Sequence, residues 1–163
     1  MALIEVKNLS FSYPGSSDSV FEQVSLCIDT EWRLGIVGGN GKGKTTFLRL
    51  LQGDYEYSGQ IQNVNPVRYC PGIIERDDGE EQAVNILMER YPDCELWKVV
   101  RELHELEMEE GILYQPWEHL SPGERTRIML AFLFADDISY LLLDEPTNNL
   151  DEQTRETVKK YLG

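Results

Sequence analysis

The chain has 163 residues, 41% of them hydrophobic, and a formal net charge of −14 from 29 acidic and 15 basic residues. This length and composition predict one globular domain with its own core, and the acidic balance argues against direct nucleic-acid binding, which needs a basic surface. No run of about 18 apolar residues could span a membrane, no secretory signal opens the chain, and three scattered cysteines indicate reduced thiols, so we expect a cytoplasmic protein without membrane insertion.

The N-terminal third predicts strands followed by a helix. Residues 3–13 and 20–28 alternate between apolar and polar side chains around a turn at 14–19, which predicts an antiparallel pair. The apolar run WRLGIV at 32–37 predicts a short strand that enters a glycine-rich loop directly. Residues 44–52 have helical spacing. The core-facing residues expected in this helix are Phe47, Leu48, Leu50 and Leu51.

The glycine-rich loop matches the phosphate-binding pattern G-x-x-x-x-G-K-[ST] between its predicted strand and helix. Glycines let successive backbone N–H groups converge on an anion, and the helix N-terminus adds a positive dipole. We expect Lys44 to reach the β- and γ-phosphates of ATP, and Thr45 to offer its hydroxyl to Mg²⁺. A chance match in a glycine-rich turn is the alternative. The expected nucleotide-binding residues are Gly38, Gly39, Asn40, Gly41, Lys42, Gly43, Lys44, Thr45 and Thr46, with Lys42 adding only positive field.

The middle of the chain predicts two more strands and a helical region. Residues 58–62 and 66–70 predict short strands, and residues 80–110 have a helical pattern. One apolar face of that pattern, expected to pack in the core, consists of Leu96, Val99, Val100, Leu103 and Leu106. Acidic residues concentrate at 75–81 and 102–110. These runs indicate solvated faces, with a docking surface for a basic partner as the alternative.

Two helices with clear N-terminal signals are expected in the last third. Residues 121–136 predict a helix with Ser121 as N-cap, Pro122 at the first helical position and Glu124 at the third, which is a capping-box arrangement. Residues 151–162 predict another helix, which opens on an aspartate N-cap.

Between these helices, the apolar run at 138–146 is typical of a strand buried on both faces, and it ends in two adjacent carboxylates. Because neighbouring residues of a strand point to opposite sides, Asp144 is expected to bind Mg²⁺ together with Thr45. Glu145 is then free to orient or deprotonate the attacking water. The pattern predicts Mg²⁺-dependent ATP hydrolysis with Glu145 and Lys44 as catalytic residues; a purely structural strand end before a proline is the alternative.

The alternation of strands, loops and helices predicts an α/β fold. We expect a P-loop NTPase core with an antiparallel β subdomain, and a helical insertion at about 78–120, within one domain that covers 1–163.

These motifs resemble the nucleotide-binding domain of the ABC superfamily. Residues 38–45 match its Walker A loop, LSPGE at 120–124 its signature, and 140–145 its Walker B strand. Within the superfamily, EPTNNLD at 145–151 and the E-x-T-R continuation of the signature resemble the ABC-F branch, whose members are soluble and associate with the ribosome. The helical insertion resembles that of the antibiotic-resistance subgroup.

The resemblance implies roles for further residues. Tyr13 matches the aromatic residue that stacks on adenine, with an ordinary strand-end aromatic as the alternative. Ser121 and Gly123 match signature residues that contact the γ-phosphate of ATP on a second ABC domain, and 149–151 match the D-loop that crosses between the domains. The implied partners are that second domain, from the same full-length chain or a homodimer, and the ribosome.

The chain also departs from the family pattern. Pro122 replaces the first signature glycine and has no N–H to donate, and Gly72 stands where the Q-loop glutamine is expected, with Gln82 only a remote substitute. The sequence stops before the family's switch histidine, and His104 and His119 lie upstream of it. The resemblance therefore implies the first domain of an ABC-F protein, incomplete at its C-terminus, with weak hydrolysis in isolation.

Three functions follow as hypotheses. The first is an ATP-hydrolysing domain of an ABC-F translation or ribosome-protection factor. The second is the ATPase subunit of a membrane transporter, which the TNNLD run and the missing Q-loop glutamine disfavour. The third is a non-catalytic, nucleotide-gated interaction module, which the departures at Pro122 and Gly72 motivate.

Overall fold

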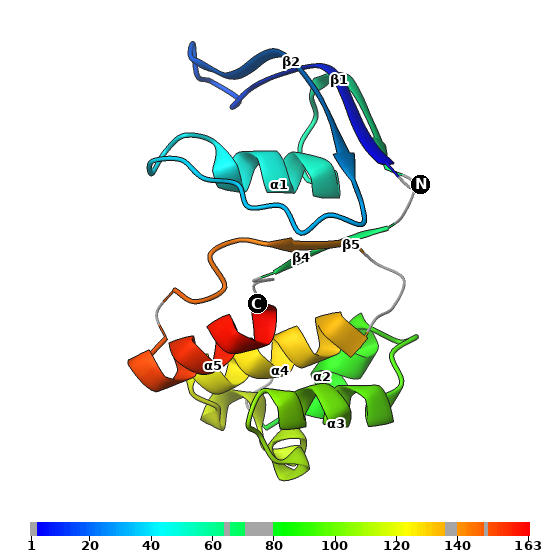
Figure 1. Ribbon diagram of the computed structural model, residues 1–163, viewed down its shortest axis with the longest axis vertical. Helices are drawn as coiled ribbons and strands as arrows, with labels where there is room; N and C mark the ends of the chain where they lie inside the picture. Colours follow the sequence, from blue (N-terminus) through cyan, green and yellow to red (C-terminus); the bar gives the residue numbers. More distant parts are fainter. Residues whose placement is uncertain (1–2, 64–65, 71–79, 136–139, 149) are drawn as a thin grey trace. The chain divides into compact units, whose positions relative to one another are not determined.

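The computed structural model describes residues 3–63, 66–70, 80–135, 140–148 and 150–163 (Figure 1). The chain divides into two compact units. The first unit comprises Met1–Tyr69 with Ile138–Asp144, and the second comprises Cys70–Asp137 with Glu145–Gly163. Within the described residues, no helix has the length and apolar character needed to cross a bilayer.

The first unit contains a three-stranded antiparallel sheet of order β2-β1-β3. Its strands are β1 (Leu3–Ser12), β2 (Ser19–Asp29) and β3 (Ser58–Asn63). The predicted pairing of the two N-terminal strands is confirmed. Asn8 adopts a left-handed backbone (φ 50°) where the register of β1 shifts between Val6 and Leu9. This irregularity resets the side-chain alternation, so that residues on both sides of it are buried in one core.

Helix α1 (Lys44–Gln52) and a second sheet complete the core of the first unit. The core-facing residues predicted for this helix are all buried: Phe47, Leu48, Leu50 and Leu51. The second sheet pairs β4 (Val67–Cys70) with β5 (Tyr140–Leu143). Its residues Tyr69 and Leu142 belong to the same hydrophobic cluster as α1 and β1. The phosphate-loop helix is therefore anchored to both sheets by burial of apolar surface.

Two strand predictions need correction. Residues 32–37 form no strand: among the described residues the segment joins neither sheet, and Trp32 and Val37 are 58% and 93% exposed. A strand needs hydrogen-bonding neighbours for its backbone groups, so an apolar run alone does not make one. Of the strand expected over 138–146, β5 is the part that forms, and only Leu142 in it is buried, so the strand is not buried on both faces. The first two residues of that prediction lie outside the described residues.

The second unit is helical. Its elements are α2 (Ala83–Arg90), α3 (Leu96–Glu105), the 3₁₀ turns η1 (Glu110–Tyr114) and η2 (Trp117–His119), α4 (Pro122–Ala135) and α5 (Glu152–Leu162). The helical pattern predicted over 80–110 is thus two helices. Pro92 explains the break, because the residue before a proline is disfavoured in helical conformation. The predicted apolar face is confirmed, with Val99, Leu103 and Leu106 buried and its other members half-buried.

The N-terminus of α4 has the predicted capping box. The Ser121 N–H donates to Glu124 Oε2 (2.7 Å), and the Glu124 N–H donates to Ser121 Oγ (3.3 Å). Pro122 is the first helical residue, where a missing N–H leaves no bond unmade. Helix α5 is capped by Asp151, whose Oδ1 accepts from the Thr154 N–H (2.9 Å), as predicted.

The acidic run at 102–110 is more than a solvated face. Tyr161 of α5 donates its hydroxyl to Glu102 (2.7 Å), and Thr157 donates to Glu107 (3.2 Å), so two of these acids hold α5 against the helical region. Figure 1 shows α3, α4 and α5 side by side in this unit. Residues 75–79 of the other acidic run lie outside the described residues. His104 and His119 are both exposed, as surface histidines would be.

The approach of β3 to β1 predicts an unequal cost for two glycine substitutions. A Cβ at Gly59 (φ 105°) would lie 2.4 Å from the Asn8 carbonyl oxygen and 2.6 Å from that of Lys7. Gly59→Ala should therefore lower the free energy of unfolding by about 3 kcal/mol, through backbone strain plus overpacking. The measurement is urea denaturation followed by circular dichroism.

Gly15→Ala provides the matched control, because Gly15 also has a positive φ (82°) but nothing lies within 4 Å of its Cβ position. We expect it to cost only about 1 kcal/mol, from backbone strain alone. Equal losses for the two variants would contradict the close approach of the strands.

Candidate functional site

The glycine-rich loop leads into α1 and is closed by its own lysine. Lys44 donates its Nζ hydrogens to the carbonyl oxygens of Gly38 (2.8 Å) and Gly39 (3.2 Å). Gly43, the N-cap residue of α1, has φ 85°, and a Cβ there would lie 2.9 Å from Val20 Cγ1. Both observations explain why this position takes glycine.

The N-terminus of α1 is arranged to receive an anion. No side chain caps this helix, and its first turn contains no acidic residue. No carboxylate of that turn therefore neutralises the positive end of the helix dipole or binds its free N–H groups. The remaining loop residues predicted to contact nucleotide, Asn40, Gly41 and Lys42, are exposed. The loop thus presents its backbone to solvent, as phosphate binding requires.

Thr45 and Asp144 are 99 positions apart in the sequence, and their side chains form a hydrogen bond. The Thr45 hydroxyl donates to Asp144 Oδ2 at 2.6 Å. A hydroxyl and a single carboxylate suit Mg²⁺, which takes few protein oxygens and completes its octahedron with water and phosphate oxygens. The pair is compatible with a magnesium ion bound with ATP, which stays a prediction. In the described part of the chain, no group of three or more His, Cys, Asp or Glu side chains could hold a metal ion.

Tyr69 is a site residue that the sequence analysis missed. Its hydroxyl donates to Asp144 Oδ2 at 2.7 Å, and its side chain is buried. Burial, reinforced by the hydrogen bond to Asp144, raises the pKa of Tyr69 to about 12. The phenol is consequently a permanent donor at neutral pH. The only signal in the sequence is a tyrosine near the end of a strand, which does not identify its partner.

Tyr13, predicted to stack on adenine, directly follows β1 and contacts the first turn of α1. Its hydroxyl is 2.7 Å from Thr46 Oγ1, and its ring packs edge-on against Phe11 and Tyr55, with ring centres 5.0 and 5.7 Å away. The side chain is still 41% exposed. An exposed ring next to the phosphate loop is compatible with base stacking, which stays a prediction.

Glu145 has a backbone conformation that strand alternation does not predict. Strand β5 ends at Leu143, and Glu145 has φ 47°, which is rare for a residue with a side chain. Asn148 donates its side-chain amide to Glu145 Oε2 and its N–H to the Glu145 carbonyl oxygen (3.0 Å). The strand therefore ends before this pair of acids, and the expected alternation of Asp144 and Glu145 along a strand is wrong.

The signature segment contacts the start of α5 within the second unit. A Cβ at Gly123 would lie 3.3 Å from Thr154 Cγ2 and 3.8 Å from Asp151 Oδ2. Ser121 is exposed and serves as the N-cap of α4. Gln82 is the N-cap residue of α2 and forms a β-bridge with Pro116. Gly72 and Asn149, at the Q-loop and D-loop positions, lie outside the described residues.

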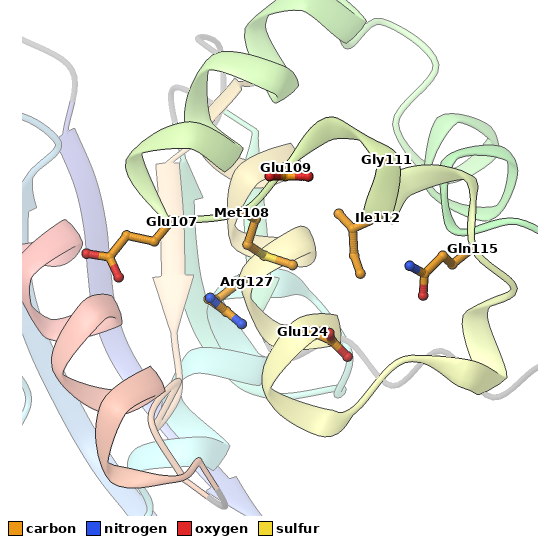
Figure 2. A pocket seen from close by; sticks show the side chains of 8 residues that line it. All are labelled: Glu107, Met108, Glu109, Gly111, Ile112, Gln115, Glu124 and Arg127. Carbon is orange, nitrogen blue, oxygen red and sulfur yellow. The ribbon is translucent and has the colours of Figure 1, made fainter.

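A pocket of about 380 Å³ lies in the second unit, between the loop that follows α3 and the start of α4 (Figure 2). Its lining residues are Glu107, Met108, Glu109, Gly111, Ile112, Gln115, Glu124 and Arg127. Arg127 donates to the Leu106 carbonyl oxygen (3.2 Å), and its Nε is buried without a hydrogen bond in the described part of the chain. None of the residues predicted to bind nucleotide or metal lines this pocket.

Comparisons with known proteins agree with these features. A family model described as "ABC transporter" matches residues 21–148. ATP-binding cassette sub-family F member 2 of Bos taurus is 32% identical over 160 residues, which cover 93% of this chain and 25% of that protein. The tungstate uptake system ATP-binding protein TupC of Peptoclostridium acidaminophilum is 34% identical over 171 residues, which cover 98% of this chain and 79% of that protein.

A similar solved structure is described as a metal-chelate type ABC transporter in an inward-facing conformation. Its TM-score is 0.80 at 25% identity, over 99% of this chain and 68% of that chain. The chain spans only 25% of the length of the sub-family F relative.

The capping box at α4 predicts a pH-dependent contribution to stability. The hydrogen bond from the Ser121 N–H lowers the pKa of Glu124 below its ordinary value of 4.5. A lowered pKa in the folded state stabilises the protein above the unfolded-state value, and this contribution is lost as the pH falls through the folded-state value. Glu124→Gln, which does not titrate, should therefore lose less stability than wild type on acidification from about pH 6 to pH 3.

Urea denaturation at several pH values measures this difference. Glu22→Gln is the control, because it removes one exposed carboxylate from β2. Its pH dependence should stay close to that of wild type. If the free energy of unfolding changes with pH in the same way for Glu124→Gln and wild type, the capping carboxylate does not contribute to the pH dependence of stability.

Proposed function

The chain belongs to the ABC transporter family, and from that membership we propose that it is the ATP-binding and ATP-hydrolysing domain of an ABC-F protein that acts on the ribosome. It has the mixed α/β fold of ABC ATPases, with an antiparallel β subdomain. ABC ATPases bind ATP with Mg²⁺ and pair their domains to form ATP sites. We propose that both compact units belong to one such domain, over 1–163, with the helical insertion at about 78–120.

The observation that carries ATP binding is the arrangement at the start of α1. Lys44 is held in the loop by two carbonyl oxygens, and a triphosphate would offer the ammonium charged oxygens instead. Thr45 and Asp144 would hold the metal ion beside the loop. Mg²⁺, when bound, neutralises charge on the phosphates. Tyr13, which directly follows β1, would stack on the adenine.

Hydrolysis is assigned to Glu145, which would orient or deprotonate the attacking water. Asn148 now holds one of its carboxylate oxygens, so the amide would share or release that oxygen when water binds. Ser121 and Gly123 would contact the γ-phosphate of ATP bound to a second ABC domain. Phosphoryl transfer depends mostly on positioning and electrostatics, so a single domain would hydrolyse ATP slowly.

The ABC-F assignment is supported by the EPTNNLD run at 145–151, by the E-x-T-R continuation of the signature, and by similarity to a sub-family F protein. We propose a cytoplasmic protein of the ribosome-protection or translation-factor kind. The ATPase subunit of a membrane transporter is the second candidate. Similarity to TupC over 79% of that protein, and to the metal-chelate type transporter structure, favours it. A non-catalytic interaction module is compatible with the missing N–H at Pro122.

Exchange of the loop lysine tests ATP binding. Lys44→Ala should weaken ATP affinity by about 10- to 100-fold, because it removes a charge-assisted contact with the phosphates. Lys7→Ala is the matched control: it removes an exposed lysine from β1, outside the glycine-rich loop, and should change affinity by less than about threefold. Titration calorimetry of the chain with Mg²⁺-ATP measures both; wild-type affinity in Lys44→Ala would refute the assignment.

Exchange of the proposed catalytic carboxylate tests the ribosomal role. In the complete protein, Glu145→Gln should slow hydrolysis and hold the ATP-bound, paired state, so that several-fold more protein sediments with ribosomes in ATP. The double variant Lys44→Ala, Glu145→Gln should reduce that increase at ATP concentrations that saturate the single variant, because its ATP affinity is lower. Sedimentation unchanged by Glu145→Gln, together with co-purification of a membrane protein, would favour the transporter alternative.

A further inference from the structure

The carboxylate of Asp144 receives two hydroxyl donors on one oxygen. Oδ2 accepts from Thr45 Oγ1 at 2.6 Å and from the Tyr69 hydroxyl at 2.7 Å. Thr45 is exposed at the start of α1, whereas Tyr69 is buried on β4. We infer that Tyr69 is a positioning residue, which fixes the orientation of the Asp144 carboxylate for the metal ion. This inference rests on the proposed Mg²⁺-ATP site.

The geometry leaves one side of the carboxylate available. Both hydrogen bonds end on Oδ2, and among the described residues Oδ1 accepts none. An aspartate side chain has a broad terminal torsion, so a fixed donor on one oxygen determines where the other oxygen points. Tyr69 can keep this role in the ATP-bound state. Thr45 is itself expected at the metal, where its oxygen takes part in metal binding, whereas a buried phenol has no such second task.

The tyrosine is held in place by its surroundings. Its ring belongs to the hydrophobic cluster of the first unit, and the guanidinium carbon of Arg49 lies 5.3 Å from the ring centre. Arg49 is in turn paired with Asp54 at 3.5 Å. A donor that packing has already immobilised loses little conformational freedom when it orients a neighbour. Partners of this kind, which orient metal ligands, typically change metal affinity when they are removed.

The same contacts also fit a purely structural role for Tyr69, because the hydroxyl of a buried tyrosine generally forms a hydrogen bond. The two roles have different consequences. A purely structural tyrosine would affect stability, and it would affect ATP binding equally with and without metal. A positioning residue affects the part of ATP affinity that depends on Mg²⁺.

Tyr69→Phe separates these roles, because it keeps the ring and removes only the hydroxyl. ATP affinity is measured by titration calorimetry in Mg²⁺ and in EDTA. We expect the gain in affinity from Mg²⁺ to fall about 10-fold, while the affinity in EDTA stays within about twofold of wild type. Tyr140→Phe is the matched control, because Tyr140 packs against the same core from the neighbouring strand β5. Its Mg²⁺ gain should equal that of wild type.

The outcomes are distinct. A wild-type Mg²⁺ gain in Tyr69→Phe, or an equal loss of affinity in Mg²⁺ and EDTA, would overturn the positioning role. Lys44→Ala, in contrast, should weaken binding in EDTA as well, because it acts on the phosphates. If wild type binds no ATP, the proposed function fails and the positioning role fails with it.

A structural measurement covers the case in which Tyr69→Phe does not fold, which circular dichroism would reveal. A crystal structure of the wild-type chain with Mg²⁺ and a non-hydrolysable ATP analogue shows where the phenol lies. A hydroxyl within hydrogen-bond distance of Asp144 in that complex supports the inference. A hydroxyl that has moved away from the carboxylate overturns it.

Discussion

The carboxylate of Asp144 is the point at which three elements of the first unit meet. Thr45 at the start of α1 and Tyr69 on β4 both donate to Oδ2 of this residue, which follows β5. The same elements also share apolar contacts, in the cluster that contains Leu50, Tyr69 and Leu142. Burial therefore fixes the elements, and the hydrogen bonds fix the polar groups at their ends. A metal site that needs only one protein carboxylate depends on that carboxylate being held in one orientation.

In the glycine-rich loop, too, hydrogen bonds hold a charged side chain in one place. The ammonium group of Lys44 needs hydrogen-bond acceptors. The loop itself supplies them, as the carbonyl oxygens of Gly38 and Gly39. The loop is thus already curved around the ammonium, with the uncapped N-terminus of α1 beside it. Binding a polyanion would exchange these partners for stronger ones and would not require the loop to be built anew.

The second unit is organised around α4, in which every residue from Ile128 to Leu133 is buried. The N-terminus of α4 is satisfied locally by the capping box at Ser121, whereas long-range hydrogen bonds join α5 to Glu102 and Glu107. Gly123 lies against Thr154, so the signature turn and the first turn of α5 share one packed corner. A Cβ at position 123 would lie 3.3 Å from Thr154 Cγ2, which is a tight contact, so packing within this unit favours a small residue there.

Features that depend on neighbours within a few positions follow from the sequence. The helix over 44–52 with its buried face, the capping box at Ser121, the aspartate cap of α5 and the phosphate-loop pattern could all be predicted, because helical periodicity and capping are local. Only the folded structure shows that residues 32–37 join neither sheet in the described part of the chain, since a strand needs hydrogen-bonding neighbours that the segment does not specify. It also placed the Tyr69 hydroxyl on Asp144, 75 positions away, because the packing of β4 beside β5 is set by the whole core and not by either strand.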